Sequence, residues 1–139
     1  MMDIFKIMNI SASGMTAQRF RLDVIATNIA NAETTRTENG EPYRRKIPIF
    51  SEYVKMYMGY EEPSGVKVEK VAVDTSPFRL VYDPSHPDAD ENGYVKMPNV
   101  NVLREMVDLI NAQRAYEANA SVLNSLKTIA NSALQIGTR

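Results

Sequence analysis

The prolines of this chain are confined to its middle, and their distribution constrains the fold more than any other feature. All seven lie between residues 34 and 98, whereas residues 1–33 and 99–139 contain none. Proline breaks helix interiors because it lacks an amide hydrogen and its ring clashes with the preceding turn. We therefore expect a helical segment over 1–33, a turn-rich middle over 34–98 and a second helix over 99–139.

The N-terminal segment carries an apolar repeat with the period of a coiled-coil seam. The spacing alternates between four and three residues along Ile4, Met8, Ser11, Met15, Gln18, Leu22, Ile25 and Ile29. Gly14 interrupts this helix, where glycine costs about 1 kcal/mol relative to alanine. Two interpretations stay open for Gly14: a break in the helix, or close approach by a neighbouring backbone.

The C-terminal segment predicts one long helix with a broad apolar surface. Asn99 or Asn101 can cap its start, and Gly137 can end it. A helix over 101–136 would be about 54 Å long, which exceeds the diameter of about 37 Å of a compact chain this size. We expect an elongated, mainly α fold with a small β insert, in which the terminal helices pair as an antiparallel coiled coil and other chains cover their overhanging apolar faces.

The middle segment predicts several short strands that form one small sheet. The valines between 66 and 73 alternate with charged residues, with a break in register after Glu69. Glu61 and Glu62 precede Pro-Ser-Gly and are expected on a loop surface. The other strand candidates are 78–82, 94–97 and 43–50, the last confined to an edge by Pro48.

Composition excludes several chemistries. The absence of cysteine removes disulfides, thiolate catalysis and Cys-ligated metals, and His86 is the sole histidine. The net charge of −1 gives no reason to expect nucleic acid, so the basic run 44–46 is interpreted as a solvated strand edge, with pairing to an acidic neighbour in an assembly as the alternative. No window approaches 18 apolar residues, and the first residues lack the pattern of a secretion signal, so we expect neither a membrane span nor a cleaved signal peptide.

One acidic loop offers an alternative from a different functional class. Asp88, Asp90 and Asn92 match the first half of a calcium loop of the EF-hand type, but its twelfth position holds Asn99 instead of glutamate. An acidic turn is therefore the favoured interpretation, and a calcium-binding module stays the alternative. A hydrolase built on His86 lacks the glycine-rich nucleophile turn.

Three groups of motifs resemble one protein family. At the N-terminus these are Ser11-Ala12-Ser13-Gly14-Met15 and residues 26–35; at the C-terminus they are Glu105-Met106 and residues 112–119. Together they resemble the bacterial flagellar axial proteins of the rod and hook class. The middle segments 34–37, 42–46, 77–84 and 86–90 resemble the proximal rod members of that family, with another rod or hook subunit as the alternative.

The resemblance implies a structural, non-enzymatic subunit without cofactors. Such proteins leave the cytoplasm through the flagellar type III export apparatus without signal cleavage. They assemble helically into the basal-body rod, in the periplasm of Gram-negative cells, and the rod transmits motor torque. The implied partners are further copies of the chain, other rod subunits, the export apparatus and an adaptor at the base of the rod, but no nucleic acid.

We expect the helix seam of that assembly to lie on matching faces of the two terminal helices. Its polar members interrupt apolar faces, and on pattern alone they either fix register or face solvent. The predicted seam residues are Met15, Leu22, Ile25, Asn28, Ile29, Asn31, Met106, Leu109, Gln113, Arg114, Tyr116, Asn119 and Leu123.

Overall fold

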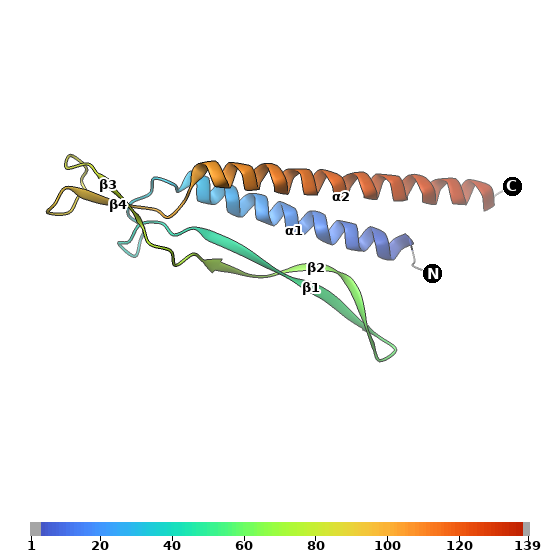
Figure 1. Ribbon diagram of the computed structural model, residues 1–139. Helices are drawn as coiled ribbons and strands as arrows, with labels where there is room; N and C mark the ends of the chain where they lie inside the picture. The colour runs from blue at the N-terminus through green and yellow to red at the C-terminus, as the bar shows by residue number, and fades with distance from the viewer. Residues whose placement is uncertain (1–3, 138–139) are drawn as a thin grey trace.

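Two long helices and two β-hairpins form an elongated molecule in the computed structural model, which describes residues 4–137 (Figure 1). Helix α1 spans Ile4–Ala30 and helix α2 spans Val102–Gly137. They run antiparallel, because Asn28 contacts Glu105 while Gly14 lies against Asn119. The expected pair of long helices around a β-containing middle is confirmed, whereas coiled-coil packing between them stays a prediction.

Local signals set the helix boundaries. The Oδ1 of Asn101 accepts a hydrogen bond of 3.1 Å from the amide of Arg104, which caps α2 at its start. Helix α1 continues through Gly14, so a helix break, one of the two interpretations left open for this residue, is excluded. The close approach at Gly14 comes from a side chain, because a Cβ added there would lie 3.1 Å from Nδ2 of Asn119.

The middle of the chain forms two separate hairpins, so the expectation of one small sheet is wrong. Strands β1 (Lys46–Tyr57) and β2 (Tyr60–Val73) form a long antiparallel ribbon, and β3 (Arg79–Tyr82) pairs with β4 (Tyr94–Met97). The predicted break at Glu69 is confirmed as a bulge, since the partners of two successive β1 residues are Lys70 and Val68.

Both strands of the ribbon extend beyond the predicted strand candidates, through residues 51–57 in β1 and 60–65 in β2. Met58 and Gly59 form its two-residue turn with φ angles of 49° and 86°, as a type I′ turn requires. Glu61 and Glu62 are therefore strand residues rather than loop residues. Strand β2 continues past Pro63 because this proline lies beside a second register shift in the ribbon.

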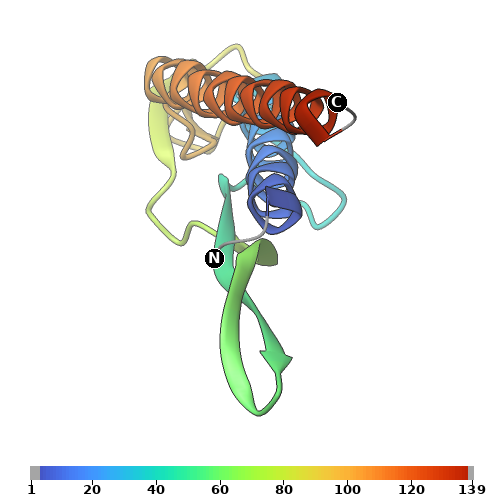
Figure 2. The ribbon, with the colours of Figure 1, turned by 90° about the vertical axis from the view of Figure 1, so that its right-hand side faces the viewer.

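The ribbon is attached to α1 at a close backbone contact. Gly65 has φ of 132°, and a Cβ there would come within 2.2 Å of the Ser13 hydroxyl oxygen. That oxygen accepts a hydrogen bond of 3.1 Å from the amide of Val66, and Lys6 forms an ion pair with Glu62 farther along. Figure 2 shows the consequence: the ribbon and α2 lie on opposite sides of α1.

The buried core is small and lies where the helices meet the middle of the chain. Its apolar cluster consists of Ala32, Tyr43 and Val100. Among the described residues of α2, only Glu105 and Ala112 are buried. Most of the apolar surface of this helix is therefore not covered by its own chain.

Candidate functional site

Asn28 forms the centre of a buried polar network between the two helices and β1. Its Nδ2 donates to the Lys46 carbonyl at 2.9 Å and to Oε2 of Glu105 at 3.0 Å. Its Oδ1 accepts from the Tyr43 hydroxyl and from the Lys46 amide, both at 2.9 Å. Since an amide side chain can donate twice and accept twice, every hydrogen-bonding position of Asn28 is filled.

Glu105 connects this centre to a cluster of charges. The carboxylate is fully buried, and its Oε1 accepts a hydrogen bond of 2.5 Å from Nε of Arg45. The guanidinium of Arg45 also lies 3.6 Å from Asp108 and 3.9 Å from Asp74, while Arg21 approaches Asp108 at 3.9 Å. A buried carboxylate requires pairing with a positive charge, because the loss of hydration costs roughly several kcal/mol for each buried ion.

Asn99 joins the approach to α2 to the same network. Its Oδ1 accepts from the Arg45 amide at 2.8 Å, and its Nδ2 donates to the carbonyls of Asp74 and Ser76. Hydrogen bonds from the hydroxyl and amide of Ser76 lower the pKa of Asp74, and the nearby Arg45 lowers it further. Asp74 therefore stays ionised beside Arg45.

Burial raises the pKa of Tyr43, and the negative charge of Glu105 raises it further. The hydroxyl consequently keeps the proton that it donates to Asn28. The network joins α1, β1 and α2 through specific polar contacts. Such contacts fix the register of the two helices, because sliding either helix would leave buried groups unpaired.

The structure places the predicted seam residues in three environments. Ile25 and Asn28 are buried between the elements. Three residues of α2 are exposed within the single chain, namely Met106, Gln113 and Arg114. The others are half-buried: Met15, Leu22, Ile29, Asn31, Leu109, Tyr116, Asn119 and Leu123.

Sequence reasoning missed most of the network, including Tyr43, Arg45 and Glu105. The apolar stripe placed Met106 toward the partner helix, but within the chain the inward position belongs to Glu105. The interpretation of 44–46 as a solvated strand edge is confirmed for Lys46, which is exposed, but is wrong for Arg45, which is largely buried. Arg44 stacks on Phe78 at 4.1 Å. The sequence did contain one signal for the burial of Glu105: it lies at heptad spacing from Ala112, on the same face of the helix.

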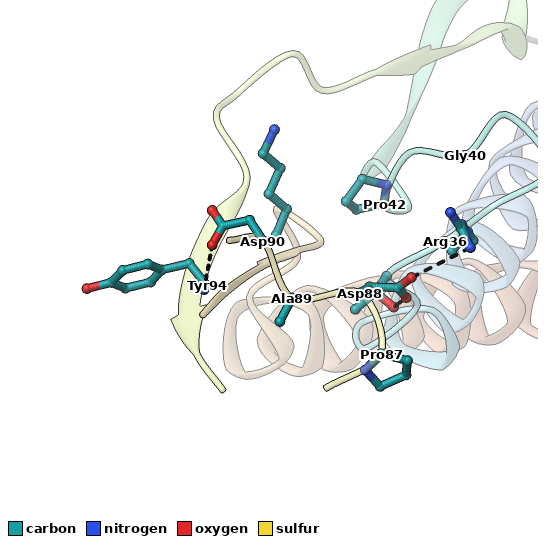
Figure 3. Close-up of a pocket in the computed structure, with 10 residues that line it drawn as sticks. Arg36, Gly40, Pro42, Pro87, Asp88, Ala89, Asp90 and Tyr94 are labelled. Carbon is teal, nitrogen blue, oxygen red and sulfur yellow. Dashed lines mark hydrogen bonds and ion pairs between the residues drawn. The ribbon is translucent and has the colours of Figure 1, made fainter. Parts of the chain in front are cut away.

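The acidic loop lines an open pocket of about 400 Å³ (Figure 3). Its two aspartates point apart: Asp88 accepts from Thr35 and pairs with Arg36, whereas Asp90 accepts from the Tyr94 amide. Within residues 4–137, no group of three or more acidic or histidine side chains could hold a metal ion. The calcium alternative is therefore not favoured.

His86 has a local structural role in the same loop. Its Nδ1 accepts a hydrogen bond of 3.0 Å from the Asp88 amide, and its own amide donates to the Asp83 carbonyl. These bonds stabilise consecutive turns between β3 and β4.

Comparison with known families places the chain in a class. Residues 8–36 match the family "Flagella basal body rod protein", and residues 91–136 match "Flagellar basal body rod FlgEFG protein C-terminal". The matched regions contain most of α1 and nearly all of α2. The fold and these matches together define a structural protein of the flagellar basal-body rod, not an enzyme.

Comparison with individual relatives identifies the family within this class. The chain is 46% identical to the flagellar basal-body rod protein FlgC of Borreliella burgdorferi, covering 97% of this chain and 98% of the relative. It is also 46% identical to FlgC of Bacillus subtilis and 43% identical to FlgC of Salmonella typhimurium, in each case over 98% of this chain and 99% of the relative. The chain belongs to the FlgC family.

In the part of the chain that the structure describes, neither helix is both long enough and apolar enough to cross a membrane.

Proposed function

We propose that this chain is a subunit of the proximal flagellar rod and assembles helically by packing its terminal helices against those of neighbouring subunits. The apolar surface of α2 carries the proposal. It exposes more than a third of each of these large residues: Val102, Leu103, Met106, Val107, Ile110, Val122, Ile129, Leu134 and Ile136. Exposed apolar surface of this extent marks sites of protein association.

The seam of this assembly comprises the thirteen predicted residues, packed as a coiled coil. The heptad spacing of α1 supports that mode of packing. Met106, Gln113 and Arg114, which are exposed in the single chain, face neighbouring subunits. The buried network around Asn28 holds the two helices in a fixed register and lets the subunit transmit torque as a stiff unit.

Export and location complete the proposal. The subunit leaves the cytoplasm through the flagellar export apparatus without cleavage, and in Gram-negative cells it assembles in the periplasm above an adaptor at the base of the rod. The family relationship supports these steps. Mass spectrometry of purified basal bodies tests them: we expect the chain, with its N-terminal residues intact, at a fixed ratio to other rod proteins. Its absence from basal bodies would contradict the proposal.

Leu123→Asp tests the seam directly. Leu123 is half-buried on α2, and a carboxylate there would have to enter an apolar contact between subunits. We expect loss of swimming, with the purified monomer still folded. The matched control is Asn124→Asp, which adds the same charge at the neighbouring exposed position and should leave swimming intact. Normal swimming of the Leu123 variant would remove this face from the seam.

A further inference from the structure

The turn between β1 and β2 presents large apolar side chains to solvent. Met58 is 84% exposed and Tyr60 is 79% exposed, and their neighbours Met56 and Tyr57 are also largely exposed. We call these four residues the ribbon tip. Tyrosine and methionine are enriched in the buried cores of protein interfaces. Nothing in the fold of the single chain accounts for this composition at an outermost turn.

The backbone of the tip gives a second, independent observation. Met58 adopts a φ of 49°, a left-handed conformation that is unfavourable for a residue with a Cβ. Asparagine or glycine at this position of a type I′ turn would be better for the stability of the hairpin. An unfavourable residue whose side chain makes little contact within its own chain points to a contact outside it.

The C-terminal half of α2 is a complementary surface on the same molecule. Its exposed large residues include Ile129, Leu134 and Ile136. The tip and this half of α2 lie toward the same end of the molecule but on opposite sides of α1 (Figures 1 and 2). They therefore do not meet within one chain, so a contact between them requires two copies.

Charge complementarity supports the same pairing. Lys127 is the only charged residue between 118 and 137, and it is exposed. The ribbon near the tip is acidic, since Glu52 and Glu61 outnumber Lys55, while Glu62 is already paired with Lys6. Within residues 4–137, neither the Lys127 side chain nor the Glu61 side chain forms a hydrogen bond or ion pair.

We propose that the ribbon tip of one copy docks on the C-terminal half of α2 of a second copy, with Met58 against the apolar residues around Ile129 and Glu61 beside Lys127. The contact uses a different surface on each copy, so it is heterologous and repeats from copy to copy. This inference rests on the proposed assembly and names one contact within it.

Cysteine cross-linking in assembled basal bodies tests this contact. Because the chain has no cysteine of its own, Met58→Cys combined with Ile129→Cys introduces a single defined pair. We expect covalent oligomers of this chain on oxidation. The matched control pairs Met58→Cys with Leu103→Cys, which is more exposed than Ile129 but lies at the other end of α2, and should give no such product. Cross-links to a different rod protein, or none, would overturn the second copy as the occupant.

Met58→Gly separates docking from folding. It relieves the left-handed strain, so the monomer should unfold at the same or a higher urea concentration, while its incorporation into basal bodies should fall at least tenfold. A charge exchange gives an independent readout: Glu61→Lys and Lys127→Glu should each reduce incorporation, and the double variant should recover it. Full incorporation of the Met58 and both single charge variants would overturn the inference. If the unmodified chain were absent from basal bodies, the proposed function itself would fail.

Discussion

Asn28 on α1 and Glu105 on α2 are 77 positions apart in the chain, and a hydrogen bond of 3.0 Å joins their buried side chains. Both residues are almost or fully inaccessible, in a molecule that buries few side chains. The contact most specific to the native helix pairing is therefore polar, although the predicted seam is mainly apolar.

Replacing Asn28 should be costly. Asn28→Ala would remove the hydrogen-bond partner that Asn28 supplies to Oε2 of Glu105, to the Tyr43 hydroxyl and to the Lys46 backbone. We expect a loss of at least about 3 kcal/mol in the free energy of unfolding, measured by urea denaturation. Asn31→Ala is the control, because its side chain bonds only locally, and it should cost less than about 1 kcal/mol. Equal costs would contradict the role assigned to Asn28.

The Glu105–Arg45 pair should show strong coupling. Glu105→Leu leaves Arg45 largely buried with fewer partners, and Arg45→Leu leaves a fully buried carboxylate, so each should cost about 3–5 kcal/mol. The double variant should cost less than the sum of the two, because neither charge is then left uncompensated. A double-mutant cycle measures this difference, and additive costs would show that the pair does not act as a unit.

Gly14 and Asn119 should also be coupled. Gly14→Ala improves helix propensity by about 1 kcal/mol but places a Cβ 3.1 Å from Nδ2 of Asn119. We expect no gain in unfolding free energy in the native background and a gain of about 1 kcal/mol when Asn119→Ala is also present. Thermal denaturation of the native chain and the three variants checks this, and an equal gain in both backgrounds would exclude contact at this crossing.

The contact between the ribbon and α1 depends on Gly65. Gly65→Ala combines an unfavourable φ of 132° with a clash against the Ser13 hydroxyl, whereas Gly40→Ala changes a φ of 77° with open space around it. Both variants therefore carry backbone strain, but only the first displaces the ribbon. Hydrogen exchange should show faster exchange of the Val66 amide in the Gly65 variant alone, and protection of that amide would contradict the steric argument.

Stability should fall at alkaline pH partly through Tyr43. Because its pKa is raised above the ordinary 10.0 on folding, its contribution is complete below pH 10.0 and is lost as pH rises through the folded value. Urea denaturation on both sides of pH 10.0 should show this loss, and Tyr43→Phe should show a smaller one. An identical pH dependence in the variant would assign the effect to other groups.

Features with a local cause could be predicted from sequence. The proline distribution located the helices, the alternation around Glu69 located a bulge, and Asn101 proved to be a cap. Each depends on residues within a few positions of one another. The strand over Tyr94–Met97 was found with its observed bounds for the same reason.

Features set by distant contacts could not be predicted. Gly65 has the signature of a loop, but it allows the ribbon to approach Ser13, which is 52 positions earlier. Glu105 has the signature of a solvent-facing charge, and its burial depends on Asn28 and Arg45 from other elements. The period of an apolar stripe could not distinguish Glu105 from Met106 as the inward residue.

The chain leaves α1 after Ala30 and enters α2 at Val102, beside the same end of the helical pair (Figure 1). Residues 31–101 therefore form an insertion between the two helices of a helical hairpin, near the end where Asn28 contacts Glu105. The length of such an insertion is independent of the distance between the helices. Exchanging or enlarging this insertion would leave the two helices unchanged, so one helical scaffold can carry outer parts of different sizes.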